Sequence, residues 1–186
     1  GPFEATVDNL VPGAVYHYRI SVSNIVGISW SDTESFSTHP AGAALYTATN
    51  GNHTSGANWT GAYSDLATVL AIAEPGDTIY IAGHTFAVDA AYEEESVYRW
   101  HDVSDVTLRE GYAAADNQDL PGARDSDQWQ TIIARASGDN RARVMEFANL
   151  DNCLLEQIIV RDGNLSGCSN ARGGGILLSA CTNITI

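Results

Sequence analysis

Acidic side chains are the residues of this chain best suited to hold a ligand by simple chemistry. Four aspartates crowd one polar stretch, and they are Asp116, Asp119, Asp125 and Asp127. A second acidic run covers residues 93–95. Carboxylate oxygens supplied by loops are ligands that Ca²⁺ prefers, although the spacing here matches no EF-hand or nonapeptide pattern. We therefore predict Ca²⁺ as the cofactor to test, with a solvated acidic loop as the alternative.

Aromatic rings are the second group that could bind a ligand, because they offer a large apolar face with a polar edge. Tyr112 and Trp129 lie in or beside a polar insertion and are the candidates for carbohydrate binding. Trp100 falls in a repeated apolar position and is expected to be structural. The five His show no metal-ligand spacing, and the sequence holds no convincing Ser/His/Asp order and no phosphate loop. The sequence thus carries no complete catalytic signature.

The three cysteines give little support to a metal site. Cys153, Cys168 and Cys181 include no CxxC pair, so zinc is disfavoured. Because their number is odd, at least one thiol must be free or paired outside this sequence. Their disulfide state is left open.

The charge balance limits the classes of partner that the chain could bind. The chain carries 23 acidic residues and 9 basic ones, a formal net charge of −14, and every basic residue is Arg. Nucleic acid is disfavoured as a partner, because binding its phosphates requires a basic surface. No apolar run reaches the roughly 18 residues of a membrane-spanning helix. We expect a piece of a longer chain, since the sequence opens on Gly1 and stops inside an apolar alternation.

The elements that would position these residues begin with β-structure. Alternating apolar residues predict strands at 3–7, 16–22 and 35–38, with a turn at Pro12-Gly13 and a polar loop before the last strand. Residues 39–43 are small and rich in helix and strand breakers, so they are predicted to be a linker.

Residues 1–38 resemble the last three strands of a fibronectin type III domain. The match rests on a turn, a tyrosine pair, a Trp-Ser pair and a final strand, in that order: Leu10, Pro12, Gly13, Tyr16, Tyr18, Trp30, Ser31 and 35–38. The resemblance places Tyr16 in a tyrosine corner, where the phenol hydroxyl bonds to upstream backbone. It implies a partial β-sandwich that acts as a spacer, marginal on its own because three strands cannot bury both faces.

Residues 44–83 predict a strand, a helix and a second strand. The helix begins after Ser64 or Asp65, either of which can cap it, and ends at Pro75-Gly76. Its apolar stripe at helical spacing is Leu66, Val69, Leu70 and Ala73. The strands are expected at 44–48 and 77–83.

Beyond residue 95 an internal repeat is present. Stretches 98–108, 145–155 and 176–186 align without gaps. Five columns are apolar in every copy: Tyr98/Met145/Ile176, Trp100/Phe147/Leu178, Val103/Leu150/Cys181, Val106/Cys153/Ile184 and Leu108/Leu155/Ile186. A polar column, Asp105/Asn152/Asn183, holds residues that tolerate a left-handed bend and can hydrogen-bond along a stack. The pattern predicts strand, tight bend and strand in each copy, with the copies stacked around one shared core.

The same stack accommodates two further predicted strands, at 131–134 and 157–160. The interval 109–130 is predicted to be a polar insertion, and 173–175 a glycine turn. Residues 44–186 resemble the capped N-terminal part of right-handed parallel β-helix proteins of the pectate-lyase type. The resemblance is nearest to large bacterial surface adhesins of the polymorphic outer-membrane protein type. It is carried by 45–48, 56–59, 62–63, 65–66, 75–83 and 173–176. It implies an all-β solenoid with an N-terminal capping helix.

Three functions follow from that resemblance. The first is a non-catalytic extracellular surface or adhesion module that engages polysaccharide or a cell surface. The second is a fragment of a secreted polysaccharide lyase or other carbohydrate-active enzyme, and the third is a carbohydrate-binding module. A lyase of this fold implies a Lys or Arg base. Since the chain has no Lys, Arg161 and Arg172 are the candidates, with a plain surface pair of Arg161 and Asp162 as the alternative.

The adhesion function is preferred, because no catalytic constellation is complete. It implies a secreted or cell-surface location. An open solenoid end and a partial sandwich both present unpaired strand edges, so we also predict self-association through these edges.

Overall fold

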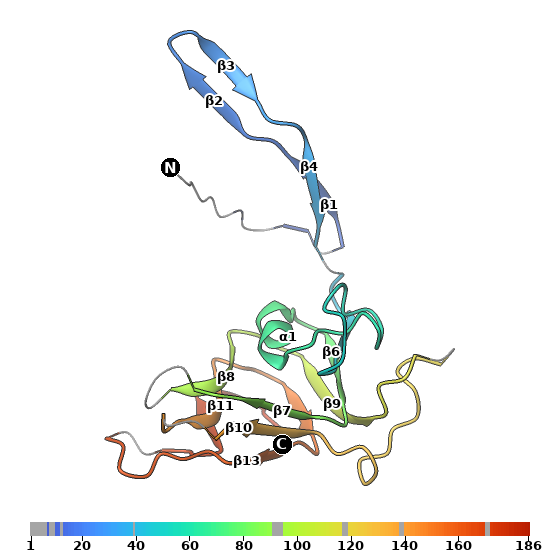
Figure 1. Ribbon diagram of the computed structural model, residues 1–186, viewed down its shortest axis with the longest axis vertical. Helices are drawn as coiled ribbons and strands as arrows, with labels where there is room; N and C mark the ends of the chain where they lie inside the picture. The colour runs from blue at the N-terminus through green and yellow to red at the C-terminus, as the bar shows by residue number, and fades with distance from the viewer. Residues whose placement is uncertain are drawn as a thin grey trace. The chain divides into compact units, whose positions relative to one another are not determined.

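The computed structural model describes residues 7, 10–11, 13–38, 40–90, 95–116, 119–137, 140–169 and 172–186. Strands account for most of its regular structure, which confirms the all-β class (Figure 1). The elements are β1 (Val15–Tyr18), β2 (Ser21–Asn24), β3 (Gly27–Trp30), β4 (Glu34–Ser37), β5 (Ala44–Thr47), α1 (Leu66–Ile72), β6 (Thr78–Ala82), β7 (Thr85–Val88), β8 (Ser96–His101), β9 (Thr107–Tyr112), β10 (Ile132–Arg135), β11 (Arg143–Ala148), β12 (Leu154–Glu156), β13 (Ile159–Arg161) and β14 (Ile176–Ser179).

The chain divides into two compact units, residues 1–43 and 44–186. The predicted strand at 3–7 lies outside the described residues except for Val7, and so do positions 93 and 94 of the acidic run. No described helix is long and apolar enough to cross a membrane.

The first unit is a two-stranded antiparallel ribbon. β1 pairs with β4 and β2 pairs with β3, and the Ser31 amide donates to the Ile20 carbonyl between the two ladders at 2.8 Å (Figure 1). The single strand predicted at 16–22 is therefore wrong, because the chain leaves the ladder after Tyr18 and rejoins it at Ser21. The loop expected before the last strand is wrong as well, since it contains β3.

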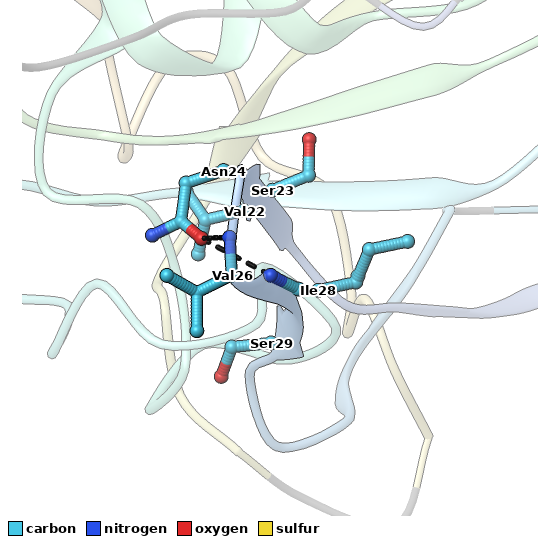
Figure 2. Close-up of a pocket in the computed structure, with 7 residues that line it drawn as sticks. Val22, Ser23, Asn24, Val26, Ile28 and Ser29 are labelled. Carbon is cyan, nitrogen blue, oxygen red and sulfur yellow. Dashed lines mark hydrogen bonds between the residues drawn. The ribbon is translucent and has the colours of Figure 1, made fainter.

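The ribbon reverses at a turn that an asparagine holds. The Asn24 side-chain oxygen accepts hydrogen bonds from the amides of Val26 (2.8 Å) and Gly27 (3.1 Å), and Figure 2 shows both bonds converging on that oxygen. Asn at this position is favoured because its side chain can satisfy the amides of a tight turn. The shallow hollow at the turn is lined by residues 22–24 and 26–29.

The tyrosine predicted to bond upstream backbone does so. The Tyr16 hydroxyl accepts a hydrogen bond from the Val11 amide at 2.7 Å. Its ring stacks on Phe36, with centroids 5.7 Å apart. The large apolar side chains of this unit are nevertheless exposed, and they include Val15, Val22, Ile25, Val26, Ile28 and Trp30. The ribbon does not bury its own apolar surface.

The second unit consists of three parallel sheets that the chain visits in rotation. Sheet I has the order β12-β9-β6-β5, sheet II β13-β10-β7, and sheet III β14-β11-β8. The chain passes from sheet I to sheet II to sheet III three times, and we call each passage a circuit. In Figure 1 the strands of successive circuits lie one above another, with α1 at one end of this unit.

The pairing register confirms the gap-free alignment of the repeats. Met145 lies opposite both Tyr98 and Ile176, and Leu155 lies opposite Leu108, as the columns require. The stacked apolar columns form the core, in which Tyr98, Trp100, Val106, Leu108, Met145, Phe147, Leu150 and Leu155 are almost fully buried.

The bend between sheet III and sheet I repeats in every circuit. Asp105, Asn152 and Asn183 take left-handed φ angles of 57°, 52° and 51°, which confirms the predicted bend. The Asn152 amide donates to the Asp105 carboxylate at 2.6 Å, while Asn183 donates to Asp151 instead. A second left-handed column, Asp102/Asn149/Ala180, was not predicted, and Asn149 donates to Asp102 at 2.7 Å within it.

The helix agrees closely with its prediction. Asp65 is the N-cap and its carboxylate accepts from the Thr68 amide at 2.7 Å, while Leu66, Val69 and Leu70 are buried. α1 packs against β8 and β5. This apolar face covers core residues of the first circuit that would otherwise be exposed at that end.

Three details of the second unit differ from prediction. β7 was missed. Residue 157 does not begin a strand, because Gln157 turns the chain from sheet I to sheet II with φ 56° and β13 begins at Ile159. The insertion starts later than 109, since β9 continues to Tyr112 in pairing with β6. The loop between β9 and β10 therefore covers 113–131, and we call it the insertion loop.

Candidate functional site

The outer face of sheet I carries a column of large polar and aromatic side chains. Successive residues of a strand point to opposite faces, and Leu45, Ile79, Leu108 and Leu155 form the buried inner column. The residues that follow them pair in the same register: Tyr46 with Tyr80, Tyr80 with Arg109, and Arg109 with Glu156. We call Tyr46, Tyr80, Arg109 and Glu156 the outer column.

The first half of the outer column is an aromatic cluster. Tyr46 and Tyr80 stack with centroids 5.2 Å apart, and Trp59 meets Tyr46 edge-on at 4.8 Å. Tyr112 lies edge-on to Tyr80 at 5.4 Å. Tyr46, Trp59 and Tyr112 are buried and Tyr80 is half-buried. Burial raises the pKa of both Tyr46 and Tyr112, so these phenols stay neutral in ordinary conditions.

The second half is charged and partly open to solvent. Arg109 donates through Nε to Glu156 Oε2 at 2.7 Å, and Arg124 Nη1 approaches the same oxygen at 3.3 Å. The side chains of Arg109, Arg124 and Glu156 are 39%, 31% and 22% exposed. The hydrogen bond to Glu156 raises the pKa of Arg109, so this guanidinium is a permanent cation held by a fixed carboxylate.

Arg124 fastens the insertion loop to this column. Its Nε donates to the Glu110 carbonyl at 2.8 Å and its Nη2 lies 3.5 Å from the fully buried Glu110 carboxylate. Its Nη2 also donates to Gln157 Oε1 at 3.1 Å, and the Ser126 hydroxyl donates to the same oxygen at 2.8 Å. Gly111 permits this approach, because it has φ 94° and an added Cβ would meet Arg124 and Ser126 at 3.0 Å.

The start of the insertion loop is fastened at a second point. The two carboxylate oxygens of Asp116 accept from the amides of Trp59 (2.7 Å) and Thr60 (2.8 Å). The Trp59 indole donates to the Pro121 carbonyl at 3.0 Å. Hydrogen bonds from Thr60 and from the Trp59 amide lower the pKa of Asp116. The insertion loop therefore forms one wall beside the outer column.

Replacing Asp116 with Asn should reduce the loss of folding stability that the protein shows at low pH. Because the folded-state pKa of Asp116 is lowered, its contribution to folding stability is present above the unfolded pKa of about 3.9 and is lost as pH falls through the folded pKa. Urea unfolding of wild type and Asp116→Asn, compared at pH 6 and about pH 3, should show a smaller loss for the variant. Asp127→Asn, an exposed site in the same loop, is the control, and equal losses in all three proteins would contradict the prediction.

The four aspartates proposed for Ca²⁺ have separate positions and structural contacts. Asp116 binds backbone amides as described, and Asp125 Oδ1 accepts from the amides of Asp127 (3.2 Å) and Gln128 (3.0 Å). Asp119 and Asp127 are exposed. Among the described residues, no group of three or more His, Cys, Asp or Glu side chains is placed to hold a metal ion. Calcium stays a prediction without a located site.

The predicted carbohydrate-binding and catalytic residues occupy different places. Tyr112 is 4% exposed inside the aromatic cluster, and Trp129 is half-buried where its backbone packs against Gly83. Arg161 ends β13 and forms an exposed pair with Asp162, with Nε and Oδ2 3.4 Å apart. Arg172 is exposed and its carbonyl lies 3.5 Å from Nη2 of Arg143.

A Ser/His/Asp grouping that the sequence did not reveal lies near the start of α1. His53 Nδ1 is 2.9 Å from the Ser64 hydroxyl and 3.6 Å from Asp65 Oδ2. In a catalytic triad the two ring nitrogens have different partners, one the nucleophile and the other the carboxylate. Here both partners meet the same nitrogen, and Asp65 already caps the helix. The grouping therefore differs from a catalytic triad, in which the carboxylate orients the ring through its second nitrogen.

The charged half of the outer column was also missed from sequence. Extending the repeats 98–108 and 145–155 by one residue aligns Arg109 with Glu156, an opposite-charge pair that the register brings together. That one extra column was the available signal. Arg124 carries no such signal, because it lies in the insertion loop. No protein-family model, curated protein or solved structure matches the chain.

Proposed function

We propose that this chain is a non-catalytic extracellular module that binds a polysaccharide or a cell surface. Its second unit is the capped N-terminal part of a right-handed parallel β-helix, and residues 1–38 are the last strands of a fibronectin type III domain that serves as a spacer. The observation that carries the proposal is the outer column of sheet I, where Tyr80, Arg109 and Glu156 lie partly open to solvent on paired strands.

The stacked sheets support this role because they are a rigid platform. Arg109 and Glu156 lie on adjacent strands, and the buried inner column fixes the register of those strands. The insertion loop adds a wall that Arg124 and Asp116 hold in place. A binding surface that is ordered before the ligand arrives loses little conformational freedom on binding. A polar column beside aromatic rings suits a ligand with both hydroxyls and apolar C–H faces.

The non-catalytic part of the proposal rests on the geometry of the reactive groups. His53, Ser64 and Asp65 are close together, but Ser64 and Asp65 approach the same ring nitrogen of His53. A catalytic triad uses one ring nitrogen for the nucleophile and the other for the carboxylate. Arg161, the candidate lyase base, is engaged in an exposed ion pair with Asp162, with Nε and Oδ2 3.4 Å apart. Location outside the cell follows from the β-helix and fibronectin-type resemblance and is part of the same proposal.

A retention and turnover screen tests the function. The purified chain would be mixed with insoluble cellulose, chitin, xylan and mannan, and with soluble polygalacturonate and alginate, in CaCl₂ or in EGTA. Retention or binding on at least one polysaccharide, without growth of the ultraviolet band of unsaturated uronates, is the expected result. Growth of that band would replace the proposal with a polysaccharide lyase and direct mutagenesis to Arg161 and Arg172. No binding to any of the six polysaccharides would overturn it.

A further inference from the structure

We propose that Arg109, Glu156 and Gln157 form a binding site for a neutral saccharide and contact adjacent hydroxyl groups of one sugar ring. This inference rests on the proposed function, and it names the ligand class and the site. The three residues lie where β9 and β12 meet the insertion loop. Each of them keeps at least one hydrogen-bonding group that has no partner among the described residues.

Each of the three residues has bonding capacity left after its contacts within the protein. Arg109 binds Glu156 through Nε, which leaves its Nη groups without a hydrogen-bond partner among the described residues. Glu156 accepts a hydrogen bond from Arg109 through Oε2, and Arg124 forms an ion pair with the same oxygen, which leaves Oε1 as an acceptor. Gln157 Oε1 accepts from Arg124 and Ser126, which orients its amide and leaves Nε2 as a donor.

The pattern of free groups fits a diol. Arg109 offers donors beside the Glu156 acceptor, and a hydroxyl group both accepts and donates. Two neighbouring hydroxyls of a sugar can therefore accept from Arg109 and donate to Glu156 at the same time. Gln157 supplies another donor at the edge of the same column. The half-buried ring of Tyr80, paired next to Arg109, supplies apolar surface for the C–H groups of the sugar.

Charge selects a neutral ligand over an acidic one. The cluster contains two cations, Arg109 and Arg124, and two carboxylates, Glu110 and Glu156, so its local formal charge is zero. The whole chain carries −14, which repels a polyanion at long range. An acidic polysaccharide would also compete with Glu156 for Arg109 rather than use both.

The site is already ordered without a ligand. Arg109 and Glu156 are 2.7 Å apart in a charge-assisted bond on paired strands. Gln157 lies at the corner from sheet I to sheet II with a left-handed φ of 56°. Arg124 and Ser126 hold its side chain from the insertion loop.

The experiment titrates the full chain with soluble neutral oligosaccharides derived from cellulose, xylan, mannan and galactan, and with polygalacturonate oligomers as the acidic arm. Binding is measured by calorimetry and by NMR of the Gln157 side-chain amide. The variants are Arg109→Met and Gln157→Asn, because Asn tolerates the left-handed backbone but its side chain is shorter. Arg99→Met is the matched control, since Arg99 also forms a partly exposed ion pair on an outer sheet position, with Glu95 at 3.6 Å.

We expect at least one neutral oligosaccharide to bind and to shift the NMR signal of the Gln157 side-chain amide. Its affinity should fall about tenfold or more in Arg109→Met and in Gln157→Asn. Its affinity for Arg99→Met should equal that for the wild type. Neutral binding that leaves the amide signal and both variants unchanged would overturn the site and leave the proposed function standing. Binding of the acidic oligomers alone would overturn the ligand class. Absence of binding in every arm would overturn the inference, while the retention screen on insoluble and soluble polysaccharides decides the proposed function separately.

Discussion

Replacing Trp100 with Ala should destabilise the second unit more than any other side-chain truncation in the repeats. Trp100 is 1% exposed, it meets Phe147 edge-on with centroids 5.8 Å apart, and it occupies a column shared by three circuits. Removing a buried indole leaves a large cavity, and such truncations cost about 4 kcal/mol. Urea unfolding followed by circular dichroism should therefore show a much lower midpoint.

The same column provides the control for this experiment. Leu178 stands in register with Phe147 and Trp100 but is 45% exposed, so Leu178→Ala should cost only about 1 kcal/mol. Trp100→Phe should fall between the two, because it keeps an aromatic ring while removing an indole N–H that has no hydrogen-bond partner among the described residues. Equal losses for Trp100→Ala and Leu178→Ala would show that the columns do not form a common core.

Gly163→Ala is the second substitution expected to have a large effect. Gly163 follows β13, and a Cβ added there would collide with the Gly174 carbonyl oxygen. That oxygen accepts from the Val144 amide at 3.1 Å, so relief of the clash must disturb β11. Overpacking of this kind costs about 3 kcal/mol. The unfolding midpoint should fall, and amide exchange at Val144 should become faster.

Gly174→Ala is the matched control, because the clash is one-sided. A Cβ on Gly174 would lie 3.6 Å from the Gly163 oxygen, an ordinary contact. Neither glycine has a left-handed φ, so the two substitutions differ in steric contact and not in backbone strain. We expect Gly174→Ala to change stability by less than about 1 kcal/mol. Similar midpoints for both variants would count against the close approach of these two loops.

The repeats made register the most predictable part of the fold. A gap-free alignment states which residues face each other, and the pairs of Met145 with Tyr98 and with Ile176 follow from it directly. The helix was predictable because Asp65 is a local cap and its apolar stripe has helical spacing. Both signals are written in short stretches of sequence.

The parts that were missed either have a weak local pattern or depend on contacts between distant residues. β7 has only one buried residue, Phe86, so its apolar pattern is weak. Tyr112 appears available in sequence, but Trp59 and Tyr80 bury it. Arg124 reaches Glu110 and Gln157 from a loop without periodicity, so no local pattern could place it. The candidate site was therefore harder to predict than the scaffold.

The corners of the circuits have unequal freedom to change in length. The corner from sheet III to sheet I keeps one length in every circuit, because the left-handed columns that include Asp105 and Asn152 must align. The corner from sheet I to sheet II is short after β6 and β12 but contains the whole of 113–131 after β9. For protein engineering this makes 113–131 a position at which the chain can display a foreign peptide. A foreign peptide placed in 113–131 replaces contacts at a single corner, whereas one placed at 102–105 shifts the strand register of the circuits that follow.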